Sequence, residues 1–154
     1  MVEDKIKVVV LSQRINELSY NTYIEQTENS ITVVNNYKES TKEESDEVVN
    51  EKVEISINLA RSKSDKEKYL TTCDITIIDE KKDNALVMRK LYLRALYEIK
   101  VPGWTKSNMD DDIEESVRVL LKNESIKQLS ILIERLTEND EGFPPIKINV
   151  SELV

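Results

Sequence analysis

Three stretches in the middle of the chain alternate apolar and polar residues, a pattern that predicts strands with one buried and one solvent-facing side. We expect these strands near residues 52–62, 69–79 and 90–101. Their short polar connections favour an antiparallel meander. The inward-facing positions are Val53, Ile55, Ile57 and Leu59, then Cys73, Ile75 and Ile77, then Leu91, Leu93, Ala95, Tyr97, Ile99 and Val101.

An earlier strand is expected near residues 6–20. Its apolar run Val8–Leu11 is typical of a well-buried strand, whereas the positions from Ile15 onward keep no clean period and indicate a bend or a bulge. Residues 79–84 are polar and predict a second turn between strands. A short helix over residues 85–90 is an open alternative to an earlier start of the last strand.

The last third of the chain predicts a helix over about residues 110–137. Ser107 or Asn108 is the expected N-cap, and acidic residues in the first turn favour the positive end of the helix dipole. Apolar residues recur at helical spacing, namely Ile113, Val117, Leu120, Leu121, Leu129, Leu132, Ile133 and Leu136. Residues 122–125 leave two alternatives, one long helix or two collinear helices.

Four strands followed by a helix predict an α+β fold, with a four-stranded antiparallel sheet and a long C-terminal helix packed on one face. The 154 residues fit a single domain, 1–154. Residues 24–50 interrupt this pattern, because the stretch 38–47 contains no apolar residue and predicts a mobile acidic loop. Two interpretations of the loop remain open: a disordered connection, or a lid or partner-binding segment.

The amino-acid composition excludes most catalytic chemistry. The chain has no histidine and one cysteine, so Ser-His triads, Cys-His pairs and most zinc sites are ruled out. Its two isolated glycines cannot form a phosphate-binding loop. The acidic run Asp110–Asp112 lacks the spacing of a calcium loop, and Cys73 stands where a small core residue is expected. We therefore expect no catalytic residue, no metal, no cofactor and no enzymatic activity.

Charge and hydropathy restrict the partners and the location. The net charge of −8 disfavours sequence-independent nucleic-acid binding. A single cysteine allows no intramolecular disulfide, which suits a reducing compartment. The charged segment Met1–Lys7 does not resemble a signal peptide, and no apolar run approaches the roughly 18–20 residues that span a bilayer. We expect a cytoplasmic protein without nucleic-acid partners and without membrane insertion.

Several segments resemble the SecB-type export chaperones. Gln13-Arg-Ile15 followed by Leu18-Ser-Tyr20 is similar to the first strand of that family. Val53–Ile57 and Tyr69–Ile78 are similar to its central strands, and Phe143–Ile148 resembles the Phe-Pro exit from its long helix. The resemblance extends over nearly the whole chain. A SecB-like family of uncharacterised Gram-positive proteins fits the same pattern equally well.

The resemblance implies a four-stranded antiparallel sheet with a long helix on one face, in chains that assemble as homodimers and commonly as tetramers. The founding members are ATP-independent holdases, which bind non-native preproteins in long apolar grooves and pass them to the translocase motor SecA. Other relatives serve as chaperones of toxin–antitoxin modules. The implied partners are thus unfolded or partly folded polypeptides, SecA, and further copies of the chain.

Some functional residues of the family can be carried over by position. Ile55 and Ile57 match two alternating leucines of the groove floor, and Val49 stands where the family has a tryptophan. Glu17 matches an acidic residue that helps SecB to receive the tail of SecA, whereas Asn21 replaces a second acidic residue. The resemblance therefore implies a partner contact at Glu17 and a client-binding groove formed by Val49, Val53, Ile55 and Ile57.

Two functions are compatible with these observations. The first is a holdase chaperone for unfolded or exported chains, which needs exposed apolar surface rimmed by charge and no catalytic group. The second is a specific protein-interaction module on the same fold, such as a toxin–antitoxin-associated chaperone or an adaptor. A partner screen separates them, because the first binds many polypeptides and the second binds one.

Overall fold

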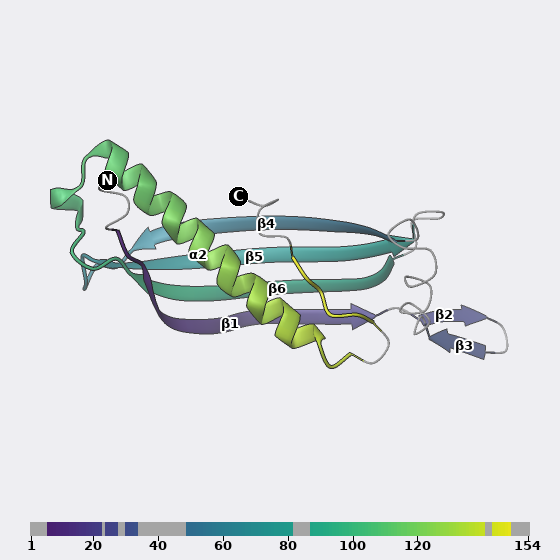
Figure 1. Ribbon diagram of the computed structural model, residues 1–154. Coiled ribbons are helices and arrows are strands. Elements are labelled where there is room, and N and C mark those ends of the chain that lie inside the picture. The colour runs from purple at the N-terminus through teal and green to yellow at the C-terminus, as the bar shows by residue number, and fades with distance from the viewer. Residues whose placement is uncertain are drawn as a thin grey trace.

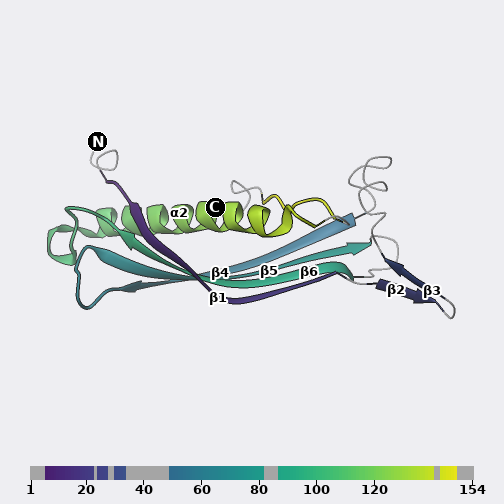
Figure 2. The same cartoon turned by 90° about the horizontal axis from the view of Figure 1, so that it is seen from below.

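A computed structural model of the chain describes residues 6–22, 24–27, 30–33, 49–81, 87–140 and 143–148. In this part of the chain, one long helix lies across one face of a four-stranded antiparallel sheet (Figure 1, Figure 2). The sheet contains β1 (Val9–Thr22), β4 (Val49–Arg61), β5 (Lys68–Lys81) and β6 (Val87–Lys100), and the helix is α2 (Asp111–Thr137). The expected α+β fold is confirmed.

The strands are ordered β1-β6-β5-β4 across the sheet. Because β4, β5 and β6 are successive neighbours, the expected meander is right for these three strands. The first strand, β1, for which the sequence predicted no neighbour, pairs with β6 at the opposite side of the sheet from β4 and so completes a Greek key. β1 and β4 are therefore the two edge strands (Figure 1).

The central strands β5 and β6 carry most of the hydrophobic core. One face of each strand is buried at every second residue, from Tyr69 to Asp79 in β5 and from Leu91 to Ile99 in β6. The helix places Leu121, Leu129 and Ile133 against this face, and all three are fully buried. The alternation read from the sequence is confirmed for both strands.

β1 is exposed along almost its whole length, so the prediction of a well-buried first strand is wrong. Its register with β6 shifts between Val10 and Ser12 and again between Ile15 and Glu17. An extra residue in one strand of a pair disrupts the alternation of side chains, which explains why the sequence shows no clean period here. Four large apolar side chains of β1 are between 42% and 49% exposed, namely Val9, Leu11, Ile15 and Leu18.

Strands β5 and β6 both extend further toward their connection than the sequence predicts. Asp79 belongs to β5 and is buried, so the polar turn does not begin there. Residues 87–90 belong to β6, and the helix considered over residues 85–90 is wrong for this stretch. Arg89 lies directly opposite Asp79 in the register of the two strands.

Helix α2 is continuous through residues 122–125, so the alternative of two collinear helices is wrong. Ser125 faces the sheet, where its Oγ donates to the Leu121 carbonyl at 2.8 Å and lies 2.9 Å from Thr71 Oγ1 on β5. The polar residue at this position is thus satisfied inside the core and does not interrupt the helix. The N-cap is Asp110, whose carboxylate accepts from the Ile113 amide at 2.8 Å, and not Ser107 or Asn108.

Part of the predicted loop over residues 24–50 is described. β2 (Ile24–Thr27) and β3 (Ser30–Val33) form a separate antiparallel pair. The acidic stretch 38–47, on which the loop prediction rested, lies outside the described residues.

Buried Arg89 of β6 connects the sheet to the segment that follows helix α2. Arg89 Nε donates to Asp79 Oδ2 at 2.7 Å, and both side chains are at most 2% exposed. Its Nη1 donates to the Pro144 carbonyl at 2.6 Å, and the guanidinium lies 5.2 Å from the centre of the Phe143 ring. We call Arg89, Asp79, Tyr20, Phe143 and Pro144 the arginine cluster.

Tyr20 of the arginine cluster connects β1 to the end of the helix. Its hydroxyl donates to Asp140 Oδ2 at 2.5 Å and accepts from Arg89 Nη1 at 3.4 Å. Burial and the hydrogen bond to Asp140 raise the pKa of Tyr20 to about 12. Nearby, the Ile146 amide donates to Thr137 Oγ1 at 2.8 Å, which holds the segment after α2 against the last turn of the helix.

We expect the arginine cluster to stabilise the fold strongly. Arg89→Met leaves the Asp79 carboxylate buried without its cation, so the free energy of unfolding should fall by about 3–5 kcal/mol in urea titrations. Arg94→Met is the matched control, because Arg94 pairs with Asp74 at 2.6 Å on the outer face of the sheet, where both side chains are partly exposed. That substitution should cost at most about 1 kcal/mol. Equal losses in the two variants would contradict this prediction.

Candidate functional site

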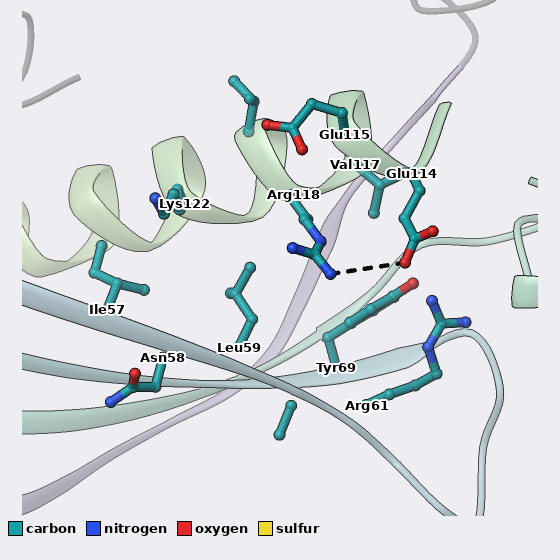
Figure 3. A pocket seen from close by; sticks show the side chains of 12 residues that line it. Ile57, Asn58, Leu59, Arg61, Tyr69, Glu114, Glu115, Val117, Arg118 and Lys122 are labelled. Carbon is teal, nitrogen blue, oxygen red and sulfur yellow. Dashed lines mark ion pairs between the residues drawn. The ribbon is translucent and has the colours of Figure 1, made fainter. Parts of the chain in front are cut away.

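A pocket of about 420 Å³ lies between the end of β4 and the first half of α2 (Figure 3). It is lined by Ile57, Asn58, Leu59, Ala60 and Arg61 of β4, Tyr69 of β5, and Glu114, Glu115, Val117, Arg118, Val119 and Lys122 of α2. Pockets of this size can hold several side chains of a ligand. We call it the β4–α2 pocket.

The pocket arises from the way in which one helix crosses four strands. α2 runs diagonally over the sheet from the β4 side to the β1 side (Figure 1). Its first half lies beside β4 without covering that strand, so Ile57 and Leu59 pack against the core and remain only half-buried. The neighbouring strand β5 is fully covered, and Cys73, the cross-strand partner of Ile57, is inaccessible.

The inner part of the β4–α2 pocket is apolar. Ile57 and Leu59 contribute from the strand, and the buried Val117 contributes from the helix. Val119 lines the pocket from α2 and is 43% exposed, although large apolar side chains on a helix normally face the core. Two helix positions correspond to about 200°, so Val119 lies on the side of α2 opposite Val117, and an apolar ligand group would contact Ile57, Leu59 and Val117.

The outer part of the pocket is charged. Arg61 lies over the Tyr69 ring, with its guanidinium carbon 4.9 Å from the ring centre. From the helix, Arg118 points toward the strand and pairs with Glu114 at 3.8 Å (Figure 3). Burial raises the pKa of the Tyr69 hydroxyl, and Arg61 opposes that shift. Tyr69 is thus a neutral, rigid wall between the two arginines.

The structure places the sequence-predicted groove residues on one strand but not all in the pocket. Val53, Ile55 and Ile57 share the face of β4 that turns toward the helix, and all three are half-buried. Ile57 lines the pocket, whereas Val53 and Ile55 lie further back along the strand. Val49 begins β4 opposite Lys81, and its side chain lies outside the described part of the structure.

The apolar face of the second half of α2 packs against the sheet. Leu129 and Ile133 are fully buried against the sheet, while Leu132 and Leu136 pack partly against the same core. These side chains belong to the core of the domain. The open apolar surface beside β4 is found at the first half of the helix instead.

A second apolar surface lies on β1. Ile15 and Leu18 are paired with the buried residues Ala95 and Leu93 of β6, so they face the same side of the sheet as the helix. The helix does not cover them, and they are 42% and 45% exposed. We call Ile15 and Leu18, with the neighbouring Leu11, the β1 surface.

Glu17, the predicted partner contact, is exposed on β1 opposite Arg94 of β6. It belongs to the outer face of the sheet, on the side away from the helix. Arg94 donates to Asp74 at 2.6 Å and Tyr92 donates to the same carboxylate at 3.0 Å. The hydrogen bond from Arg94 lowers the pKa of Asp74. Glu17 therefore borders a polar cluster that neither lines the pocket nor touches the β1 surface.

No group of three or more potential ligands in the described ranges could hold a metal ion. Cys73 is completely buried, and burial raises the pKa of its thiol to about 11, so the reactive thiolate is disfavoured at neutral pH. Of the helices that the structure describes, none is both long and apolar enough to pass through a membrane.

Of the twelve residues that line the pocket, only Ile57 belonged to the predicted groove, and Arg61, Tyr69 and Arg118 are among those that the sequence analysis missed. Arg61 and Tyr69 flank the short connection between β4 and β5, and they are direct partners in the register of the two strands. The hairpin pattern could therefore have placed them side by side. Arg118 carries no such signal, because its position over the strand depends on the crossing direction of the helix.

Comparisons with known proteins agree on the fold alone. No family model matches the sequence, and no curated protein matches it significantly. The SecB-like chaperone Rv1957 of Mycobacterium tuberculosis, solved with a ChAD peptide from the antitoxin HigA1 (Rv1956), superposes with a TM-score of 0.60 at 4% identity. The match covers 92% of this chain and 88% of that one. The chain therefore has a SecB-like fold.

A second solved structure is a protein of unknown function from Streptococcus agalactiae. It matches with a TM-score of 0.41 at 13% identity, over 94% of this chain and 98% of that one.

The half-buried position of Ile57 can be tested by stability. In Ile57→Asp the new carboxylate can reach water through the pocket, so we expect a folded protein that loses about 1–2 kcal/mol of unfolding free energy. Ile75→Asp is the control, because Ile75 is fully buried on β5, where it pairs with Ile55, and the substitution buries an unpaired charge. It should lose more than about 4 kcal/mol and unfold, as seen by circular dichroism. Unfolding of both variants would show that Ile57 is a core residue.

Proposed function

We propose that the protein is an ATP-independent holdase chaperone that binds non-native polypeptides. The observation that carries this proposal is the half-exposed apolar row on β4 beside an open pocket, on a SecB-like fold. Clients would place apolar side chains in the pocket and along β4. Such binding needs no catalytic group, and we expect the protein not to be an enzyme.

The physical properties of the surface favour this function. A holdase must keep apolar surface accessible and remain soluble, which requires charge around that surface. Here the pocket is apolar inside and bordered by five charged side chains, and the whole chain carries a net charge of −8. We propose that the client groove starts at the pocket and continues along β4 over Ile57, Ile55 and Val53, toward Val49.

A specific interaction module on the same fold is the alternative. It is favoured by one observation: the SecB-like chaperone Rv1957 was solved with a peptide from an antitoxin. A protein of this kind would use the same pocket for one polypeptide partner. Affinity purification from the native host distinguishes the two functions, since a holdase retains many unfolded chains and a module retains one partner.

Glu17 is our proposed contact for a partner that carries a basic segment, and the translocase motor SecA is the partner that the family resemblance suggests. Glu17 is exposed on β1, at the opposite edge of the sheet from β4, and faces the side of the sheet away from the helix. A partner bound there would leave the proposed client groove open. We propose a cytoplasmic location, where nascent and unfolded clients are found.

We further propose that the chain forms a homodimer or a tetramer. β1 is an edge strand with one side unpaired among the described residues, and its apolar side chains are half-exposed. Exposed apolar edge strands tend to pair with other chains, and natural proteins cover them. A second copy would bury the β1 surface and leave β4 free for clients.

The first test is suppression of aggregation of a chemically unfolded model protein, followed by light scattering. The wild-type protein should suppress aggregation without ATP. Several-fold more of the Ile57→Asp variant should be needed for the same effect, because an apolar client side chain that covers the carboxylate removes it from water at a cost in free energy. Thr72→Asp is the matched control, since it adds the same charge on the outer face of the sheet. No suppression by the wild-type protein would contradict the holdase function.

The second test concerns assembly. The double variant Ile15→Lys/Leu18→Lys should convert the oligomer to a folded monomer in light scattering coupled to size exclusion, because two charges cannot be buried in an apolar interface. Ile131→Lys is the control, because Ile131 is a 38% exposed apolar side chain that belongs to the helix and not to β1. A wild-type monomer, or an oligomer that survives the double change, would contradict assembly through β1.

A further inference from the structure

The β4–α2 pocket follows the free edge of β4. Five successive residues of this strand line it, from Ile57 to Arg61. Side chains of a strand alternate between two faces, so an unbroken run of lining residues means that the pocket extends along the edge and exposes backbone there. β4 pairs with β5 on one side and with no strand among the described residues on the other. An extended polypeptide segment fits such an edge.

The pocket also contains Arg61, for which the described residues provide no ion-pair partner. Arg61 Nη1 is shielded from solvent and has no hydrogen-bond partner among the described residues. An unsatisfied buried guanidinium nitrogen costs free energy, which an acceptor from a ligand would recover. The guanidinium is held against the Tyr69 ring, so its direction is fixed before the ligand arrives.

The other charges of the pocket are consistent with an anionic ligand group. Glu114 is already engaged by Arg118 at 3.8 Å, and Lys122 adds a third cation to the same lining. Glu115, the remaining acidic residue, is exposed at the outer side of the helix. The lining thus carries three cations against two carboxylates in a chain whose net charge is −8.

We propose that the β4–α2 pocket selects an extended polypeptide segment in which an acidic side chain stands next to large apolar ones. The carboxylate binds Arg61, the apolar side chains contact Ile57 and Leu59, and the backbone pairs with the edge of β4. This inference rests on the proposed polypeptide-binding function and adds the chemistry of the preferred segment. The proposed preference for an acidic side chain is the reverse of the preference for basic segments that the net negative charge of the protein would produce.

Fluorescence anisotropy with three labelled peptides tests the selection. The peptides share one twelve-residue sequence of valine, isoleucine and threonine, with a single central glutamate, glutamine or lysine. The glutamate peptide should bind the wild-type protein about tenfold more tightly than the glutamine peptide, as for one charge-assisted hydrogen bond. Attraction by the net negative charge alone would instead rank the lysine peptide first.

Arg61→Met keeps the apolar stem over Tyr69 and removes the charge. In this variant the preference for glutamate should fall to less than about twofold, because both peptides lose the contact of their acceptor oxygen with Arg61 and only the glutamate peptide loses a charge-assisted one. Arg14→Met is the matched control, because Arg14 is exposed on β1 opposite Leu96, and it should keep the full preference. Circular dichroism confirms the fold of both variants.

Three outcomes overturn the selection: equal binding of the glutamate and glutamine peptides by the wild-type protein, tightest binding of the lysine peptide, or full preference in Arg61→Met. The first two comparisons use only the wild-type protein, so they decide even if the variant does not fold. If aggregation is suppressed but no peptide preference exists, this inference fails and the holdase function stands. If the wild-type protein neither binds a peptide nor suppresses aggregation, both fail.

Discussion

The structure depends on the packing of a single helix against a sheet that is too large for it. A helix of 27 residues is about 40 Å long and about 10 Å wide, whereas four strands spaced by about 4.8 Å form a wider surface. α2 can therefore cover the two central strands but not both edges. The burial of the side chains reflects this. Every second residue of β5 and β6 is buried, whereas no described side chain of β1 or β4 is fully buried.

The direction of the helix decides where the uncovered surface lies. The arginine cluster attaches the segment after α2 to β1, β5 and β6, through hydrogen bonds from Arg89 and from Tyr20. In the middle of the helix, Ser125 meets Thr71 of β5. With its end held near β1 and its centre over β5, the helix must begin beside β4. The pocket between β4 and the first half of α2 is a consequence of this attachment.

The sequence predicted the central strands well because their burial is complete on one face. Ile75 and Leu93, for example, occupy strict alternating positions, and the buried Cys73 follows the same rule. The first strand was misjudged because two bulges break its alternation and because its apolar residues suggested burial when they are half-exposed at an edge. Whether a side chain of an edge strand is buried depends on what covers that edge, and the local sequence pattern contains no information about the covering element.

The candidate site was only partly predictable. Ile57 could be placed on the correct face by its period, and the family resemblance pointed to the same strand. The burial of Arg89 could not be read from the sequence, because Asp79 stood in a stretch that looked like a polar turn. The position of Arg118 beside Tyr69 depends on the crossing angle of the helix, which arises from contacts between residues far apart in the chain.

The two uncovered surfaces differ in chemistry, and this difference bears on function. The β1 surface is apolar and has an open strand edge, so its large side chains would be best covered by a matching apolar edge. The β4–α2 pocket combines apolar walls with charged side chains, and one shielded guanidinium nitrogen there lacks a partner among the described residues. Charged and incompletely satisfied surfaces suit ligands that come and go, because water and salt can replace the ligand when it leaves. The proposed assembly through β1 and the proposed polypeptide binding beside β4 are therefore compatible on one sheet, since they would use opposite edges and different side chains.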